Sequence, residues 1–406
     1  MLSIHSCPFA RLGSRDTGGM NVYIRELCAE LAAQGCRIDI FTASHRCGHC
    51  FVLNPEQAIH LYHLKSRLAG DATRDSFDTY VSSLADEICQ IQQQGSIRYD
   101  IIHSHYWQSG IVGVALQKLW GIPHLTMFHT LSAVKKVLHV PHQDPDFRLP
   151  VEKIVAQDPA GIITSTSRER EYLKRFYDVQ EQKIETIPCG VNLNTFQPVA
   201  RGASMSRLGM AGKEKIILYV GRLDPLKGIE QLLRTLPLIR EKYSSRLLIL
   251  GEDSPDGNYL SYLKQICDDL GIYKYTDFIG SIAQVDLACY YSAADVCVIP
   301  SYYESFCLVL LESLACGTPV VASNTGIAES VITQPSRGML LENNHPEQMA
   351  AQIVRLLQTH KKTDSDIRAC RMAVEGYGWP DISARIRSAY MRLISLPQHA
   401  DIGSYG

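Results

Sequence analysis

Residues Lys215–Gly228 read KIILYVGRLDPLKG, a strand-like run followed by a loop that carries two cations and two glycines. A short run of β-branched and aromatic residues that ends at a glycine predicts a buried strand. In the loop, Arg222 and Lys227 are suited to holding a diphosphate. Gly221 and Gly228 allow the backbone to turn closely. Exposed cations after a strand are also common, so the loop alone does not distinguish a phosphate site from a solvated turn.

Strand-like runs of this kind recur along the chain and alternate with segments of helical period. The predicted strands are Leu2–His5, Arg37–Thr42, Asp100–His105, His124–His129, Gly161–Ser165, Lys215–Val220, Arg246–Gly251, Asp295–Pro300 and Thr318–Ala322. Such alternation predicts an α/β fold in which parallel sheets are covered by helices on both faces.

A polar, turn-rich segment, Gly190–Pro198, separates two series of predicted strands. The chain has 406 residues, enough for two domains of about 200 residues each. We therefore expect one Rossmann-like domain over residues 1–194 and another over residues 195–376. The segment Trp379–Leu396 has apolar residues on one side of a helical pattern, which predicts a helix packed along one face.

A second informative segment, Glu304–Pro319, reads ESFCLVLLESLACGTP. Its apolar run predicts a helix that ends at Gly317. Ser305 and Glu312 are expected to share a face of that helix, about 10 Å apart along the axis. Free N–H groups of a first turn bind anions, and a carboxylate suits the paired hydroxyls of a ribose. The pattern predicts a nucleotide-sugar site, although a buried helix with solvated glutamates would give the same spacing.

These two segments together resemble the donor half of the retaining glycosyltransferases of family 4. The resemblance implies the GT-B fold, in which two Rossmann-like, doubly wound domains face a central cleft and a C-terminal helix, here residues 377–406, crosses back to the first domain. Catalytic roles fall by resemblance on His129, Glu304, Arg222 and Lys227. Donor-binding roles fall on Gly18, Gly19, Arg222, Lys227, Ser305, Phe306, Cys307, Leu308 and Glu312. The family usually has glycine where this chain has Cys307.

The first half of the chain contributes the segment Asp16–Tyr23, DTGGMNVY, in which Gly18 and Gly19 precede an apolar helix. Two glycines let a ligand approach the bare backbone, although a plain junction between loop and helix reads the same way. His129 ends a predicted strand at its carboxyl edge, where open α/β sheets place their ligands. A lone histidine is more often structural, but residues 127–136 resemble the family's reaction-centre segment.

Members of the family that act on phosphorylated acceptors show the closest resemblance, over about residues 1–379. In those that use inositol phosphate, the acceptor phosphate is held by a cation, a tyrosine, a threonine and an arginine. By resemblance the acceptor-binding residues are Arg74, Tyr106, Thr130 and Arg148. Lysine is usual at the position of Arg74, and the simplest alternative for Arg148 is a surface ion pair with Asp144 or Asp146.

The resemblance implies transfer of glucose from a nucleoside-diphosphate glucose, UDP-glucose by preference, to a phosphorylated sugar or polyol. The favoured reaction is that of the sucrose-phosphate synthases, fructose 6-phosphate giving sucrose 6-phosphate in sucrose biosynthesis. Transfer of N-acetylglucosamine to inositol phosphate and a non-catalytic sugar-nucleotide sensor remain alternatives. No cofactor or metal is expected. Asp144-Pro145-Asp146 and Asp364-Ser365-Asp366 imitate the Asp-x-Asp of metal-dependent transferases, but neither follows a predicted core strand of the donor half.

Charge and hydropathy exclude other classes of protein. The formal net charge is −2, and no stretch collects enough Lys and Arg to track a nucleic acid backbone. No apolar run approaches the roughly 20 residues that span a bilayer. The start at Met1–His5 enters a strand pattern without a basic segment, so no signal peptide is expected. The prediction is a cytoplasmic protein; the nucleobase and oligomeric state stay open.

The chain has 13 cysteines, and most stand singly in apolar segments, as reduced core residues do. The exception is the segment His45–Cys50, in which Cys47 and Cys50 form a Cys-x-x-Cys flanked by two histidines. A metal site, a redox pair and a polar loop are the alternatives. A polar loop is favoured because no second Cys-x-x-Cys completes the usual zinc pattern.

Overall fold

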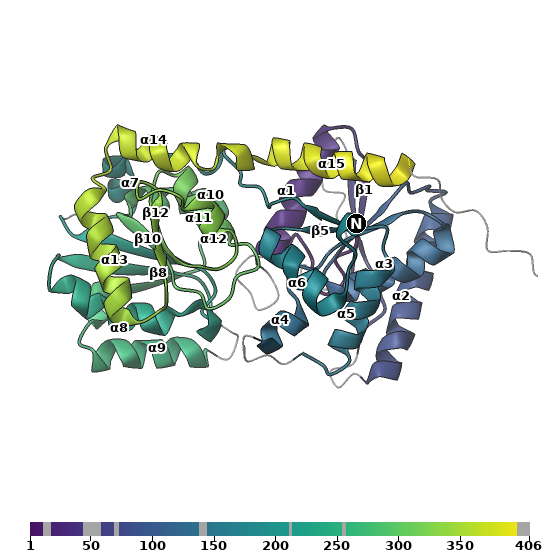
Figure 1. Ribbon diagram of the computed structural model, residues 1–406, viewed down its shortest axis with the longest axis horizontal. Coiled ribbons are helices and arrows are strands. Elements are labelled where there is room, and N and C mark those ends of the chain that lie inside the picture. Colours follow the sequence, from purple (N-terminus) through teal and green to yellow (C-terminus); the bar gives the residue numbers. More distant parts are fainter. Residues whose placement is uncertain are drawn as a thin grey trace, which may run out of the picture. The chain divides into compact units, whose positions relative to one another are not determined.

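The computed structural model describes residues 1–10, 18–43, 58–68, 73–137, 144–210, 213–253 and 257–395 (Figure 1). The chain divides into two compact units, each with its own parallel sheet. Unit 1 comprises the described residues of Met1–Ala10, Met20–Pro188 and Ile382–Gly406, and unit 2 comprises those of Arg11–Gly19 and Cys189–Asp381.

The sheet of unit 1 consists of two parallel ladders joined by the N-terminal segment. Its strands are β1 (Ile38–Thr42), β2 (Ile59–His63), β3 (Ile102–His105), β4 (His124–Met127), β5 (Gly161–Thr164) and β6 (Ile184–Thr186). The Leu2 amide donates to the His103 carbonyl at 2.9 Å, and the Ser3 amide donates to the Phe41 carbonyl at 2.9 Å. The spatial order is therefore β2-β1-N-terminus-β3-β4-β5-β6.

Helices connect these strands and cover the sheet. They are α1 (Gly19–Ala33), α2 (Arg74–Gln94), α3 (Trp107–Trp120), α4 (Ser132–Val137), α5 (Arg148–Gln157) and α6 (Ser167–Tyr177). Side-chain caps fix two of the starts: Thr73 accepts the Ser76 amide before α2, and Thr166 accepts the Glu169 amide before α6.

The last helix, α15 (Trp379–Ser395), belongs to unit 1 from Ile382 onward. Ile382 and Ile386 are fully buried, which confirms the predicted one-faced pattern. On the same helix the Tyr390 hydroxyl lies 2.6 Å from His103 Nδ1, so the helix is bonded to a strand of the unit 1 sheet.

The sheet of unit 2 has six parallel strands in the order β12-β11-β10-β7-β8-β9. They are β7 (Lys215–Val220), β8 (Ser245–Leu250), β9 (Thr276–Gly280), β10 (Val296–Ile299), β11 (Val320–Ser323) and β12 (Gly338–Leu341). The α-helices are α7 (Arg201–Arg207), α8 (Ile229–Arg240), α9 (Asn258–Asp269), α10 (Gln284–Ala293), α11 (Leu308–Ala315), α12 (Ala328–Val331), α13 (Pro346–Thr359) and α14 (Asp364–Met372).

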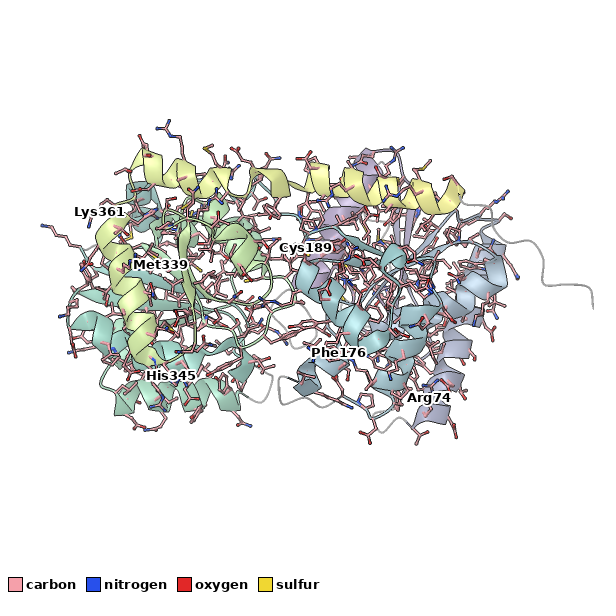
Figure 2. The ribbon with its side chains drawn as sticks, in the orientation of Figure 1. Arg74, Phe176, Cys189, Met339, His345 and Lys361 are labelled. Atoms are coloured by element: carbon pink, nitrogen blue, oxygen red, sulfur yellow. The ribbon has the colours of Figure 1, made fainter. Side chains whose placement is uncertain are left out.

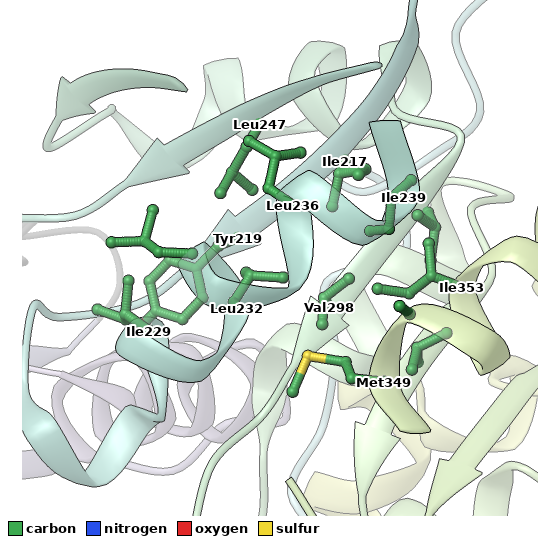
Figure 3. Close-up of a cluster of buried hydrophobic side chains, with 14 of the residues drawn as sticks. Ile217, Tyr219, Ile229, Leu232, Leu236, Ile239, Leu247, Val298, Met349 and Ile353 are labelled. Carbon is green, nitrogen blue, oxygen red and sulfur yellow. The ribbon is translucent and has the colours of Figure 1, made fainter. Parts of the chain in front are cut away.

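The core of unit 2 forms where α8 and α13 pack on its sheet. Figure 3 shows Leu232 and Leu236 of α8 and Ile353 of α13 among strand residues such as Ile217 and Val298, all of which are buried. The central strands β7 and β10 read as continuous apolar runs because helices cover both faces of a parallel sheet. The two parallel, helix-covered sheets confirm the predicted α/β class.

Numbered in chain order, the unit 2 strands lie in the sequence 3-2-1-4-5-6 from β9 to β12. With the N-terminal segment counted as its first strand, unit 1 has the same order, and β6 adds a seventh strand at its edge. In such sheets the strand order reverses next to the first strand, and the carboxyl ends there border a crevice. That edge lies between β7 and β10 in unit 2 and between the N-terminal segment and β3 in unit 1.

Within the described residues no helix is long and apolar enough to cross a membrane.

Gly228 provides a test of the packing at the carboxyl edge of unit 2. Its φ is +67°, and a Cβ there would lie 2.1 Å from the Pro300 carbonyl oxygen. Gly271 has nearly the same φ, +66°, but open space around it. Gly271→Ala should therefore lower the free energy of unfolding by about 1 kcal/mol, through backbone strain alone. Gly228→Ala should lower it by about 2 kcal/mol more, because the new Cβ also meets the Pro300 carbonyl. Urea unfolding of both variants measures the difference, and equal losses would contradict the close contact.

Candidate functional site

The loop after β7 presents its two cations on a tightly held backbone. Tyr219, buried in the strand, donates its hydroxyl to the Arg222 carbonyl at 2.8 Å. Asp224 caps the short 3-10 helix Pro225–Lys227, because its Oδ1 accepts the Leu226 amide at 2.9 Å. The Arg222 side chain is 42% exposed and lies 3.7 Å from the Asp224 carboxylate, so its guanidinium is accessible to a ligand.

Glu304, in the loop after β10, lies against the second of these cations. Lys227 Nζ is 2.7 Å from Glu304 Oε1, and Ser301 Oγ donates to the same oxygen at 2.7 Å. The Tyr302 amide donates to the Leu226 carbonyl at 2.9 Å and so joins the two loops. Because β7 and β10 are neighbours where the strand order reverses, the ion pair lies at the carboxyl edge, where sheets of this topology have their crevice.

The start of α11 differs from the prediction. Cys307 is its N-cap, with φ 87° and ψ 74°, and the helix begins at Leu308. Ser305 and Phe306 therefore precede the helix, and the expectation that Ser305 shares a helix face with Glu312 is wrong. A residue in the left-handed region cannot continue a right-handed helix. Glycine adopts such a conformation freely, which explains why glycine is the usual residue here.

Glu312 lies inside α11 and is 7% exposed. Its Oε2 accepts a hydrogen bond from the Tyr291 hydroxyl at 2.7 Å. Burial, with the adjacent Glu312 carboxylate, holds the pKa of Tyr291 well above its usual value. The tyrosine therefore stays a hydrogen-bond donor and orients the carboxylate.

In unit 1, Tyr106 follows β3 and His129 follows β4 by two residues. Both adopt positive φ, 77° and 59°, which is uncommon for residues other than glycine. His105 Nδ1 lies 3.0 Å from His129 Nε2, so one of the two nitrogens donates to the other. The ring of Tyr23 meets both histidines edge-on, at centroid distances of 5.6 and 5.4 Å. These contacts fix the imidazole of His129 at the carboxyl edge.

Burial keeps the histidines of this region neutral. It lowers the pKa of His129 to about 3, with a further contribution from His5. Burial first, and then Arg148, lowers the pKa of His5 to about 3. The pKa of His105 is also well below its usual value, mainly because of burial. At neutral pH, His129 is thus an uncharged hydrogen-bonding group.

Arg148, the first residue of α5, is completely buried and bonds through all five of its N–H groups. Nη1 donates to the Tyr106 hydroxyl at 2.9 Å and to Asp144 Oδ1 at 2.7 Å. Nη2 donates to the Thr130 carbonyl at 3.2 Å and to Thr130 Oγ1 at 3.0 Å, and Nε donates to Glu152 Oε1 at 2.7 Å. Three of the four predicted acceptor residues therefore lie together.

Glu152 is a functional candidate that the sequence reasoning missed. It is completely buried and accepts the Ser132 amide at 3.0 Å and the Tyr177 hydroxyl, besides Arg148. The i,i+4 spacing of Arg148 and Glu152 on α5 was the available signal. The predicted ion pair of Arg148 with Asp144 is present, but the arginine is buried and not at the surface.

Among the described residues, Arg74 makes no hydrogen bond or ion pair with the network around Arg148. Arg74 is the first residue of α2 and is labelled in Figure 2. Its Nε lies 2.8 Å from Asp78 Oδ2, one turn along the helix. The start of α2 nevertheless packs nearby, because Phe77 contacts Phe147 and Trp107 with ring centroids 5.1 Å away in each case. These two rings flank Arg148 and Tyr106 in the sequence.

Some of the remaining predicted residues lie in the described part of the chain and others do not. Gly19 begins α1 and Gly18 directly precedes it, whereas Asp16 and Thr17 lie outside the described residues. Cys47 and Cys50 also lie outside them. All cysteines in the described segments are free thiols. Across the same segments no group of three or more His, Cys, Asp or Glu side chains is arranged to hold a metal ion.

Known families match both halves of the chain. Residues 17–195 match the family described as Glycosyltransferase Family 4, and residues 201–369 match the family described as Glycosyl transferases group 1. A D-inositol 3-phosphate glycosyltransferase of Pseudarthrobacter chlorophenolicus is 33% identical over 96% of this chain and 94% of its own length. A protein of the same name from Streptosporangium roseum is 32% identical over 99% of this chain and 94% of its own length.

Solved structures agree on the fold. The sucrose-phosphate synthase of Thermosynechococcus elongatus superposes with a TM-score of 0.86 at 30% identity, over 97% of this chain and 98% of that one. Anabaena HepE in complex with UDP-glucose has a TM-score of 0.76 at 17% identity, over 96% and 98% of the two chains, a likeness that concerns the fold alone.

The buried neutral histidines predict acid sensitivity. Above pH 6.5 they are neutral in the folded and the unfolded chain and do not affect stability. Below it the unfolded chain binds protons that the folded chain accepts only near pH 3, so stability falls as the pH falls. His5, His124 and His129 should each contribute about 1.4 kcal/mol of loss per pH unit. Urea unfolding at pH 7.5 and 5.5 measures this slope, which His124→Gln should reduce; an unchanged free energy of unfolding would refute it.

The backbone at Cys307 predicts an unusual ranking of variants. Cys307→Gly and Cys307→Ala both remove the thiol, but only glycine relieves the strain at φ 87°. The glycine variant should be the more stable of the two by about 1 kcal/mol. At Cys316, where φ is −84°, the order should reverse. Thermal unfolding of the glycine and alanine variants at both positions tests this, and an alanine variant more stable than the glycine variant at Cys307 as well as at Cys316 would show that Cys307 is unstrained.

Proposed function

The chain belongs to the group 1, or family 4, glycosyltransferases and has the GT-B fold, and from this premise we propose that it transfers glucose from a nucleoside-diphosphate glucose to a phosphorylated acceptor with retention at the anomeric carbon. The favoured donor is UDP-glucose, and the favoured acceptor is fructose 6-phosphate, which gives sucrose 6-phosphate. Unit 2 binds the donor and unit 1 binds the acceptor in this proposal.

The donor site of the proposal is the carboxyl edge of β7 and β10. Arg222 and Lys227 take the two phosphates and stabilise the negative charge that develops on the leaving diphosphate. Lys227 is held in place before the donor binds by its ion pair with Glu304. Both described contacts of that carboxylate use Oε1, so Oε2 is left to accept a hydrogen bond from a hydroxyl of the glucose. Glu312 takes the ribose hydroxyls.

The acceptor site is supported by one observation above all, the convergence of Tyr106, Thr130 and Arg148. The Tyr106 and Thr130 side chains, from different segments, meet at the buried guanidinium of Arg148, and guanidinium and hydroxyl groups are the usual partners of a phosphate. An acceptor anchored there by its phosphate leaves its hydroxyl to approach His129, which lies next to Thr130 in the chain. His129 is neutral and orients that hydroxyl by hydrogen bonding.

Two acceptors are supported by different comparisons. The likeness to a sucrose-phosphate synthase covers nearly the whole chain at a TM-score of 0.86 and favours fructose 6-phosphate. The sequence relatives named for inositol 3-phosphate, at 31 to 33% identity among the first five, favour inositol phosphate with N-acetylglucosamine as the sugar. Both acceptors are phosphate monoesters, so the anion site serves either.

The experiment is a release assay that crosses UDP-, GDP- and ADP-glucose and UDP-N-acetylglucosamine with fructose 6-phosphate, free fructose and inositol phosphate. We expect UDP release from UDP-glucose that depends on fructose 6-phosphate. Turnover confined to UDP-N-acetylglucosamine with inositol phosphate would select the second reaction. Specific binding of donor without release with any acceptor would indicate a sugar-nucleotide sensor.

Lys227→Met tests the assignment of the diphosphate site. Losing a charge-assisted contact to the leaving group should lower kcat by roughly 30- to 1000-fold, which corresponds to about 2–4 kcal/mol. Lys242→Met changes an exposed lysine two residues beyond the end of α8; it is the matched control and should leave kcat unchanged. Near wild-type kcat in Lys227→Met would overturn the assignment.

A further inference from the structure

The carboxylate of Asp144 lies between two cations of unit 1. Its Oδ1 is 2.7 Å from Arg148 Nη1, and its Oδ2 is 3.3 Å from Lys135 Nζ. The arginine side chain is completely buried, and the lysine and aspartate side chains are 17% and 14% exposed. The two cations therefore form an anion site at the border of the interior, and the anion that occupies it is the carboxylate of Asp144.

The partners of Arg148 differ in how firmly they are held. Glu152 also accepts the Ser132 amide and the Tyr177 hydroxyl, so removing it would leave several buried donors without an acceptor. Asp144 contacts only the two cations among the described residues. It is the one charged partner of the guanidinium that an incoming anion can replace without stripping other groups.

Two further donors face the same place. The Tyr106 hydroxyl and Thr130 Oγ1 each accept a hydrogen bond from Arg148, so each keeps its own proton to donate. Neither proton has an acceptor among the described residues. One carboxylate satisfies two cations but leaves these hydroxyl protons unused, whereas a phosphate monoester has three terminal oxygens to receive them.

We propose that Asp144 occupies the place of the acceptor's phosphate, and that the phosphate displaces it to bridge Arg148 and Lys135. The inference rests on the proposed function, because it concerns the same acceptor site. It assigns the second phosphate-binding cation to Lys135 and not to Arg74, whose guanidinium pairs with Asp78. It also gives the carboxylate a role in selectivity: a neutral acceptor carries no charge with which to displace it.

Inorganic phosphate is a direct probe of this site. Its binding is measured by the rise of the thermal unfolding temperature with phosphate concentration, against chloride at matched ionic strength. Asp144→Asn removes the competing charge and should lower the Kd for phosphate by about tenfold relative to wild type. Lys135→Met should raise it by about tenfold. Asp146→Asn, an exposed carboxylate two residues away, is the matched control and should bind as wild type does.

Steady-state kinetics supply a second measurement. The KM for fructose 6-phosphate should fall in Asp144→Asn and rise in Lys135→Met, while the KM for UDP-glucose stays unchanged in both. Phosphate binding by Asp144→Asn that equals or is weaker than wild type would overturn the displacement and make Asp144 a structural partner of Arg148. Should the asparagine variant not fold, an unchanged phosphate Kd in Lys135→Met would overturn it equally.

Failure of the proposed function gives a different result. If the wild-type enzyme used fructose and fructose 6-phosphate equally and bound no inorganic phosphate, the phosphorylated acceptor itself would be wrong. If the wild type preferred fructose 6-phosphate and Asp144→Asn showed no tighter binding, the acceptor class would stand and only the displacement of Asp144 would fall.

Discussion

Parallel strand pairing with a reversal of strand order is the constraint on which the other features depend. All strands of a parallel sheet end at one edge, and where the order reverses the loops of two neighbouring strands turn to opposite faces. In unit 2 this divergence occurs between β7 and β10, whose loops carry Lys227 and Glu304. In unit 1 it occurs between the N-terminal segment and β3, next to β4, which leads to His129. Topology therefore brings together residues that are distant in sequence.

Three of the seven non-glycine residues with positive φ among the described residues lie at these edges. Tyr106, His129 and Cys307 adopt positive φ although none is a glycine. A residue that leaves a parallel strand at the crevice must turn abruptly, and conformations outside the common regions are retained only where surrounding contacts compensate. The Tyr106 amide donates to the Met127 carbonyl, and the rings of Tyr23 and His105 surround His129. Positions of this kind hold side chains rigidly, which suits groups that must meet a substrate in one geometry.

Unit 1 places a charged network in its interior. A buried ion pair costs desolvation energy that only further hydrogen bonds offset. Arg148 and Glu152 meet this requirement, because the guanidinium makes five hydrogen bonds and the carboxylate accepts from Arg148, the Ser132 amide and the Tyr177 hydroxyl. The nearby histidines avoid the desolvation cost of a buried charge, because burial lowers their pKa and keeps them neutral. The charged network of Arg148 and Glu152 lies at one end of α5, where Asp144 and Lys135 extend it towards solvent.

The sequence by itself determined the α/β class, the central strands and the helix that ends at Gly317, because buried parallel strands are continuous apolar runs that need no knowledge of their neighbours. It did not predict β2, β6, β9 or β12. Each of these is an edge strand of its sheet. β2, β6 and β9 are partly exposed and mixed in composition, so their residues alone do not predict a strand. β12 is apolar and mostly buried, but it has only four residues. The candidate residues were identified one at a time, from motifs and resemblance. Asp144 and Glu152 each stand four residues from Arg148, a spacing that the chain does carry. Only the tertiary structure brought Lys135 to Asp144 and moved Ser305 out of its helix, since contacts between separate segments and the left-handed turn at Cys307 leave no periodic signal in the chain.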